Sequence, residues 1–166
     1  TADAQLDAAR DMQLAGGASM VYHFMSDDDV KAIMKHSFVS IAPDAGLNTL
    51  GQGVPHPRGY GDNPRVLGKY VRDEKVITLE DAVRKMTSLP AQFFGFADRG
   101  VIKSGAFADL VIFNPATVGD TATYEQPHAY PNGIANVLVN GVVTVDHGKH
   151  TGVRAGVIVT KNRAKS

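Results

Sequence analysis

Apolar residues recur at helical spacing at the start of the chain, where Leu6, Ala9 and Leu14 precede a Gly16-Gly17 pair. This pattern predicts a short helix that ends at the two glycines. A second helix is predicted after Ser26, whose hydroxyl can cap it and which is followed by three aspartates. We interpret these aspartates as partners of the positive end of the helix dipole, in preference to a metal site.

Two short apolar runs, at positions 19–24 and 38–42, carry β-forming residues without a helical period. They flank the helix predicted after Ser26. We therefore expect a strand-helix-strand unit, which is typical of α/β proteins.

Positions 43–63 contain five glycines and three prolines and have few residues that build a helix or strand. Compact domains seldom keep a loop of about 20 residues unless it covers a site or binds a ligand. The loop is therefore itself an indication of function.

Two more helices are predicted beyond the loop. Pro64 is suited to the first position of one of them, with an apolar stripe behind it. The other begins after Thr78, where the sequence Thr-Leu-Glu-Asp approximates a capping box. Pro90 then begins a last short turn that Gly95 ends.

The pattern changes after position 98. Runs at 108–113 and 134–139 predict strands, and Asn140-Gly141 between two valine-rich runs is a strong hairpin signal. The chain therefore divides into an α/β part, residues 1–97, and a smaller β-rich part, residues 98–166.

Composition narrows the possible functions. The 166 residues are 43% apolar, enough for a core, and 17 basic residues balance 17 acidic ones, which disfavours binding to nucleic acid. The absence of cysteine excludes disulfides, zinc fingers and a thiol nucleophile. No apolar run has the length of a membrane span and the first residues do not resemble a signal peptide, so a soluble, cytoplasmic protein is expected.

Two residues of the long loop are candidates for chemistry. Asp44 follows the run 38–42, and a carboxylate at the end of a barrel strand is well placed for catalysis, although Pro-Asp is also a common start of a turn. Arg58 can hold a carboxylate through two parallel N–H bonds, or it can be an ordinary surface arginine.

The six histidines contain no His-x-His pair, and the sequence does not show the three ligands that catalytic zinc generally requires. His23 and Met25 lie at the end of the first predicted strand, where they can line a pocket. A single histidine at such a position is more often structural.

Several motifs resemble those of known enzymes. The segment 99–115, RGVIKSGAFADLVIFNP, resembles the G-x-I-x-x-G-x-x-A-D-L-V-I-F segment near the end of metal-dependent amidohydrolases. Two more, HPRGYGDNPRVLGKYVR at 56–72 and MTSLPAQ at 86–92, are similar to N-acyl-D-amino-acid deacylases. The likeness covers nearly the whole chain but only about the last third of such an enzyme.

This resemblance implies the C-terminal part of a TIM-type (β/α)8 barrel followed by part of a small β-sandwich. It implies zinc, bound mostly by residues outside this chain, with Asp44 as catalytic base and metal contact. Arg58 would hold the α-carboxylate of an N-acyl-D-amino acid, with Met25 and His23 near the substrate. The remaining barrel segment, in the same or another chain, is the implied partner.

The family usually has Ser-Asp-Gly around its catalytic aspartate, where this chain has Pro43-Asp44-Ala45. The loop from Asp44 to His56 is also longer than usual. Two alternatives remain: a non-catalytic fragment or accessory subunit that retains only the fold, and another amide or cyclic-amide hydrolase of the superfamily.

Overall fold

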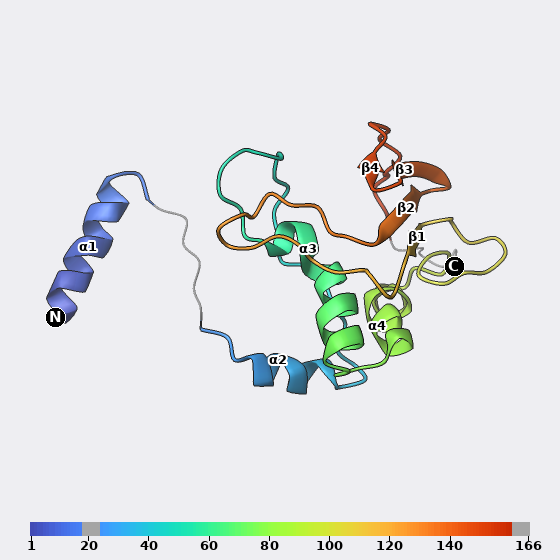
Figure 1. Cartoon of the computed structure of the whole chain (residues 1–166), viewed down its shortest axis with the longest axis horizontal. Coiled ribbons are helices and arrows are strands. Elements are labelled where there is room, and N and C mark those ends of the chain that lie inside the picture. The colour runs from blue at the N-terminus through green and yellow to red at the C-terminus, as the bar shows by residue number, and fades with distance from the viewer. Residues whose placement is uncertain (18–23, 161–166) are drawn as a thin grey trace, which may run out of the picture.

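The computed structural model describes residues 1–17 and 24–160. Helices come first and a small sheet last along the chain (Figure 1). The elements in chain order are α1 (Ala2–Leu14), α2 (Asp27–Met34), α3 (Arg58–Arg65), the π-helix η1 (Val66–Asp73), α4 (Leu79–Met86), α5 (Ser88–Phe94), β1 (Leu110–Phe113), β2 (Ile134–Val139), β3 (Val142–Asp146) and β4 (Lys149–His150).

The four strands form an antiparallel sheet in the order β1-β2-β3-β4. The predicted hairpin joins β2 to β3, and its Asn140 and Gly141 have φ angles of 51° and 81°. Positive φ at both central residues defines the tight turn that matches the twist of the two strands. The strands and the hairpin predicted in this part of the sequence are thus confirmed.

The hydrophobic core lies where α2, η1 and α4 meet. Ala82 is fully buried, and Val118, which comes from the segment between β1 and β2, is 1% exposed. The other buried members of the hydrophobic core are Met34, Val66, Leu67 and Tyr70. Helix α1 contributes no buried residue and lies apart from the other helices in Figure 1.

The run 38–42, predicted as a strand, lies in no helix or strand. A barrel strand is held by hydrogen bonds to a strand on each side. Here Ile41 donates its backbone N–H to the carbonyl of Lys85, 3.1 Å away, at the end of α4. The other predicted strand, 19–24, lies outside the described residues except for Phe24.

The helix predicted to start at Pro64 instead begins at Arg58, and Pro64 lies inside α3. Proline has no N–H to donate to the preceding turn, so a helix that contains it loses one backbone bond. The π-helix η1 begins two residues later, and the N–H of Glu74 donates to the carbonyl of Lys69 at 2.8 Å. Proline therefore marks a change of helix type here, and not a helix start.

Three other helix ends agree with the sequence, whereas α5 begins at Ser88, two residues before the predicted Pro90. Ser26 and Thr78 each accept a hydrogen bond from the backbone N–H three residues on, as N-caps do. Gly95 ends α5 in the left-handed conformation, with φ of 75°. None of the described helices has the length and apolar character needed to cross a membrane.

The aspartate that begins α2 joins this helix to η1. The carboxylate of Asp27 lies 2.6 Å from Lys31 Nζ and accepts hydrogen bonds from Lys69 Nζ at 2.9 Å and from the Tyr70 hydroxyl at 3.0 Å. The bonds from Lys31 and Lys69 hold the pKa of Asp27 far below its ordinary value of 3.8. All three aspartates lie in the first turn of α2, where the helix-dipole interpretation places them.

Replacing Asp27 with Asn is expected to lower the melting temperature at pH 7. Because the folded protein lowers the pKa of this group, its stabilising effect is complete above the unfolded-state value of 3.8 and is lost as the pH falls below it. Thermal melts from pH 7 down to pH 2 measure the difference. Asp28→Asn, in the same helix turn, is the control. If Asp27→Asn lowers the melting temperature by the same amount at every pH, the ionised Asp27 carboxylate is not the stabilising group.

Candidate functional site

The two loop residues singled out from the sequence lie against each other. Arg58 Nη2 is 3.0 Å from Asp44 Oδ2, and the Asp44 side chain is 93% exposed. Arg58 is the first residue of α3, and its backbone N–H donates to Nδ1 of His56 at 3.1 Å. The loop thus folds back so that its carboxylate reaches the start of the helix.

A cleft of about 310 Å³ opens beside Arg58. Its walls come from α3 and from the segment 120–125. Burial raises the pKa of Asp62 in this cleft, and the positive charges of Arg58 and Arg65 oppose the rise. Gly61 permits the close approach of the two walls, because a Cβ there would lie 2.5 Å from Cβ of Asp120.

The two arginines of α3 have partners of different character. Arg65 Nη1 donates to Asp120 Oδ2 at 2.8 Å, and that side chain is only 21% exposed. Arg58 has the almost fully exposed Asp44 as its partner. A carboxylate in solvent is easily exchanged for another, so Arg58 is the guanidinium better placed to bind an anionic ligand.

His128 holds the loop in place from a distant part of the sequence. Its Nδ1 accepts the N–H of Gly51 at 3.2 Å and lies 3.1 Å from the Tyr60 hydroxyl, and its Nε2 is 2.9 Å from the carbonyl of Gly53. A carbonyl can only accept, so the ring carries its proton on Nε2. One imidazole therefore fixes the middle of the loop and the first turn of α3.

Replacing His128 with Ala is expected to lower the free energy of unfolding by about 1–2 kcal/mol, since two hydrogen bonds to the loop are lost. Amide hydrogen exchange should become faster across residues 46–56, and both quantities can be measured on the purified chain. His147→Ala is the matched control, because that histidine is 88% exposed. Unchanged exchange in the loop of His128→Ala would show that the imidazole does not hold it.

The sequence did not indicate His128 or Tyr124 as parts of this site. The Tyr124 hydroxyl lies 3.3 Å from Nε2 of His56, and 68 positions separate the two residues in sequence. A contact between residues so far apart in the sequence cannot be predicted from local sequence patterns. The only signal was the concentration of tyrosine and histidine at 124–130, in a segment without the pattern of a helix or strand.

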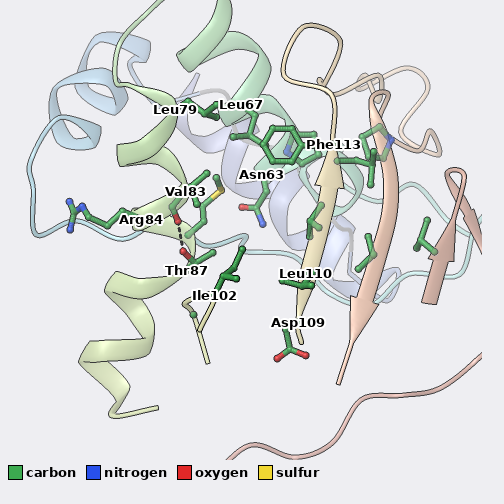
Figure 2. A pocket seen from close by; sticks show the side chains of 18 of the residues that line it. Asn63, Leu67, Leu79, Val83, Arg84, Thr87, Ile102, Asp109, Leu110 and Phe113 are labelled. Atoms are coloured by element: carbon green, nitrogen blue, oxygen red, sulfur yellow. Dashed lines mark hydrogen bonds between the residues drawn. The ribbon is translucent and has the colours of Figure 1, made fainter. Parts of the chain in front are cut away.

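A second cleft, of about 1030 Å³, separates α4 from the sheet (Figure 2). Leu79 and Val83 of α4 line it on one side, and Leu110 and Phe113 of β1 lie on the other. Its lining is mainly apolar, with Arg84, Thr87 and Asp109 at its edges (Figure 2). The apolar part of the lining provides a packing surface.

The remaining candidates do not join Asp44 and Arg58. Met25 is 73% exposed and lines neither cleft. His23 lies outside the described residues. In the part of the chain that the structure describes, no three histidine, aspartate or glutamate side chains are placed to hold a metal ion. Asp44 can supply one carboxylate oxygen, so these residues do not by themselves fit a zinc site.

A family model, a related sequence and a solved structure are all similar to this chain. Residues 1–145 match the model of the amidohydrolase family. D-aminoacylase from Alcaligenes xylosoxydans xylosoxydans is 43% identical over 95% of this chain and 31% of its own length. A crystal structure of D-aminoacylase, 43% identical, superposes with a TM-score of 0.76 over 84% of this chain and 29% of its own.

A third similarity is to the crystal structure of N-acyl-D-glutamate deacylase from Bordetella bronchiseptica, complexed with zinc and a phosphonate mimic of the tetrahedral intermediate. It is 48% identical, with a TM-score of 0.67 over 72% of this chain and 25% of its own. The chain thus spans less than a third of the length of these relatives. The similarities confirm the predicted fold class, part of an α/β barrel of the amidohydrolase type.

Proposed function

This chain belongs to the amidohydrolase family, and we propose that it is part of a zinc-dependent hydrolase that cleaves the amide bond of N-acyl-D-amino acids. The products are a D-amino acid and a carboxylate. Residues 1–97 would complete the barrel and residues 98–166 the small β-sandwich. The apolar cleft between α4 and the sheet offers a surface on which the remaining barrel segment can pack.

The observation that carries the proposal is the 3.0 Å contact between Asp44 and Arg58. The reaction needs a group that moves a proton and a group that holds the substrate's carboxylate, close to each other. The resemblance to the family implies these two roles for Asp44 and Arg58, and the fold brings the two side chains together. The cleft beside Arg58, of about 310 Å³, has the size of a small-molecule site.

In the proposed mechanism, Arg58 binds the α-carboxylate through its guanidinium and so fixes the scissile amide relative to Asp44. Asp44 then accepts a proton from the attacking water and delivers it to the amide nitrogen as the C–N bond breaks. The carboxylate therefore acts first as a general base and then as a general acid.

Zinc is implied because a relative binds it: N-acyl-D-glutamate deacylase was crystallised with zinc. In hydrolases of this kind zinc polarises the carbonyl and lowers the pKa of the attacking water. Of the described residues, Asp44 would contribute a single oxygen, and the remaining ligands would come from the rest of the protein.

The test is a chimaera in which this chain replaces the matching 31% of the Alcaligenes D-aminoacylase. We expect the chimaera to hydrolyse N-acetyl-D-leucine and to leave the L-enantiomer intact, as measured by release of the free amino acid. The D-aminoacylase itself is the positive control. A folded, zinc-loaded chimaera that hydrolyses neither enantiomer would contradict the proposal and favour the alternative of a non-catalytic fragment.

A further inference from the structure

Asp44 and Arg58, the two groups that the proposed reaction requires, are paired with each other in this structure. The guanidinium that would bind the substrate's carboxylate is already bound to a carboxylate, that of Asp44, at 3.0 Å. In this contact Arg58 also holds the Asp44 carboxylate, which would move the proton. Asp44 and the substrate therefore present the same chemical group to Arg58. A carboxylate that binds the guanidinium through two parallel N–H bonds competes for the Nη2 position that Asp44 holds.

We propose that the α-carboxylate of the substrate displaces Asp44 from Arg58, so that binding of the correct substrate releases the base. This inference rests on the proposed function and adds to it a reason why the substrate must carry a carboxylate. The exchange replaces one charge-assisted hydrogen bond with another, so its net cost is small. A ligand without a carboxylate leaves Asp44 bound to Arg58.

The burial of the two ion pairs on α3 indicates which one can exchange. Asp120, the partner of Arg65, is 21% exposed and packs so closely on Gly61 that a Cβ there would not fit. Asp44 is 93% exposed and belongs to a loop that adds no side chain to the buried core. Asp44 can therefore turn away from its arginine without disturbing packing, whereas Asp120 cannot.

The kinetic test uses the chimaera with N-acetyl-D-leucine and its α-carboxamide. Arg58→Met removes the bond to Asp44, so kcat for the carboxamide should rise about two- to fivefold, the range expected for loss of an exposed ion pair. The kcat/KM for the acid should fall. Arg65→Met is the matched control on the same helix and should not raise turnover of the carboxamide. If Arg58→Met does not raise kcat for the carboxamide either, the proposal that the substrate displaces Asp44 is wrong.

A second measurement leaves Arg58 intact and does not depend on turnover. In the chimaera freed of metal by a chelator, Asp44→Asn should bind N-acetyl-D-leucine about two- to fivefold more tightly by calorimetry, because no carboxylate then competes for Arg58. Equal affinities would overturn the inference. Hydrolysis of N-acetyl-D-leucine by the unaltered chimaera is tested first. If the chimaera does not hydrolyse it, the proposed function is wrong. If it does, but Asp44→Asn binds it no more tightly, only the displacement of Asp44 is wrong.

Discussion

Replacing Asp44 with Asn is expected to lower kcat of the chimaera by about 10²–10⁴-fold, the contribution that a positioned acid-base group typically makes. The amide has nearly the shape of the carboxylate, but it accepts no proton at neutral pH. The side chain is 93% exposed and lies outside the core, so the melting temperature should stay close to that of the unaltered protein. Initial rates with N-acetyl-D-leucine at saturation measure the effect.

Asp29→Asn is the control for this variant, because it removes the same charge from an exposed position in the first turn of α2. Its kcat should be unchanged. If Asp44→Asn turns over at the rate of the unaltered chimaera, Asp44 has no part in proton transfer. A loss of activity accompanied by unfolding in circular dichroism would likewise contradict the assignment, since the exposed carboxylate would then be needed for the fold.

The second large effect is expected for Arg58→Ala, which should lower kcat/KM for N-acyl-D-amino acids by about 10- to 100-fold. A charge-assisted hydrogen bond to a bound carboxylate contributes about 1.5–3 kcal/mol, and the truncated side chain makes none. Most of the loss should appear as a higher KM, because the carboxylate is held in the ground state as well as in the transition state.

The α-carboxamide again gives the comparison for Arg58→Ala. Its hydrolysis does not use the carboxylate contact, so its kcat/KM should not fall in parallel with that of the acid. Equal losses on the two compounds would show that Arg58 acts on the fold or on the reaction in general, and not on the substrate's carboxylate.

The features that the sequence predicted correctly are local. A helix cap such as Ser26 or Thr78 is decided by one hydroxyl and an N–H three residues away. The Asn140-Gly141 hairpin depends on two residues that tolerate positive φ. Such signals lie within a few positions of the element that they define, so the neighbouring residues are enough to predict it.

The features that differed depend on distant neighbours. A strand at 38–42 needs hydrogen-bonding strands on both sides, and the segment instead meets the end of α4 through Ile41. Pro64 lies inside α3, and the helix continues beyond it as the π-helix η1. Neither outcome can be deduced from the residues next to these positions.

The candidate site shows the same division. Asp44 was singled out because it follows the apolar run 38–42, and Arg58 because it lies in a motif similar to that of a known family. His128 was not found, because its contacts with Gly51 and Gly53 span 75 to 77 positions and the histidine lies outside the recognised motifs. The sequence thus indicated the two residues of the proposed reaction, and the structure was needed to identify the residue that holds their loop.

The most direct test of the central claim, that Asp44 and Arg58 serve one active site, is a crystal structure of the zinc-loaded chimaera with a phosphonate mimic of the tetrahedral intermediate. We predict that Arg58 contacts the α-carboxylate of the mimic and that Asp44 has left the guanidinium to lie within hydrogen-bonding distance of a phosphonate oxygen. A structure in which either side chain points into solvent while the mimic is bound elsewhere would contradict the claim.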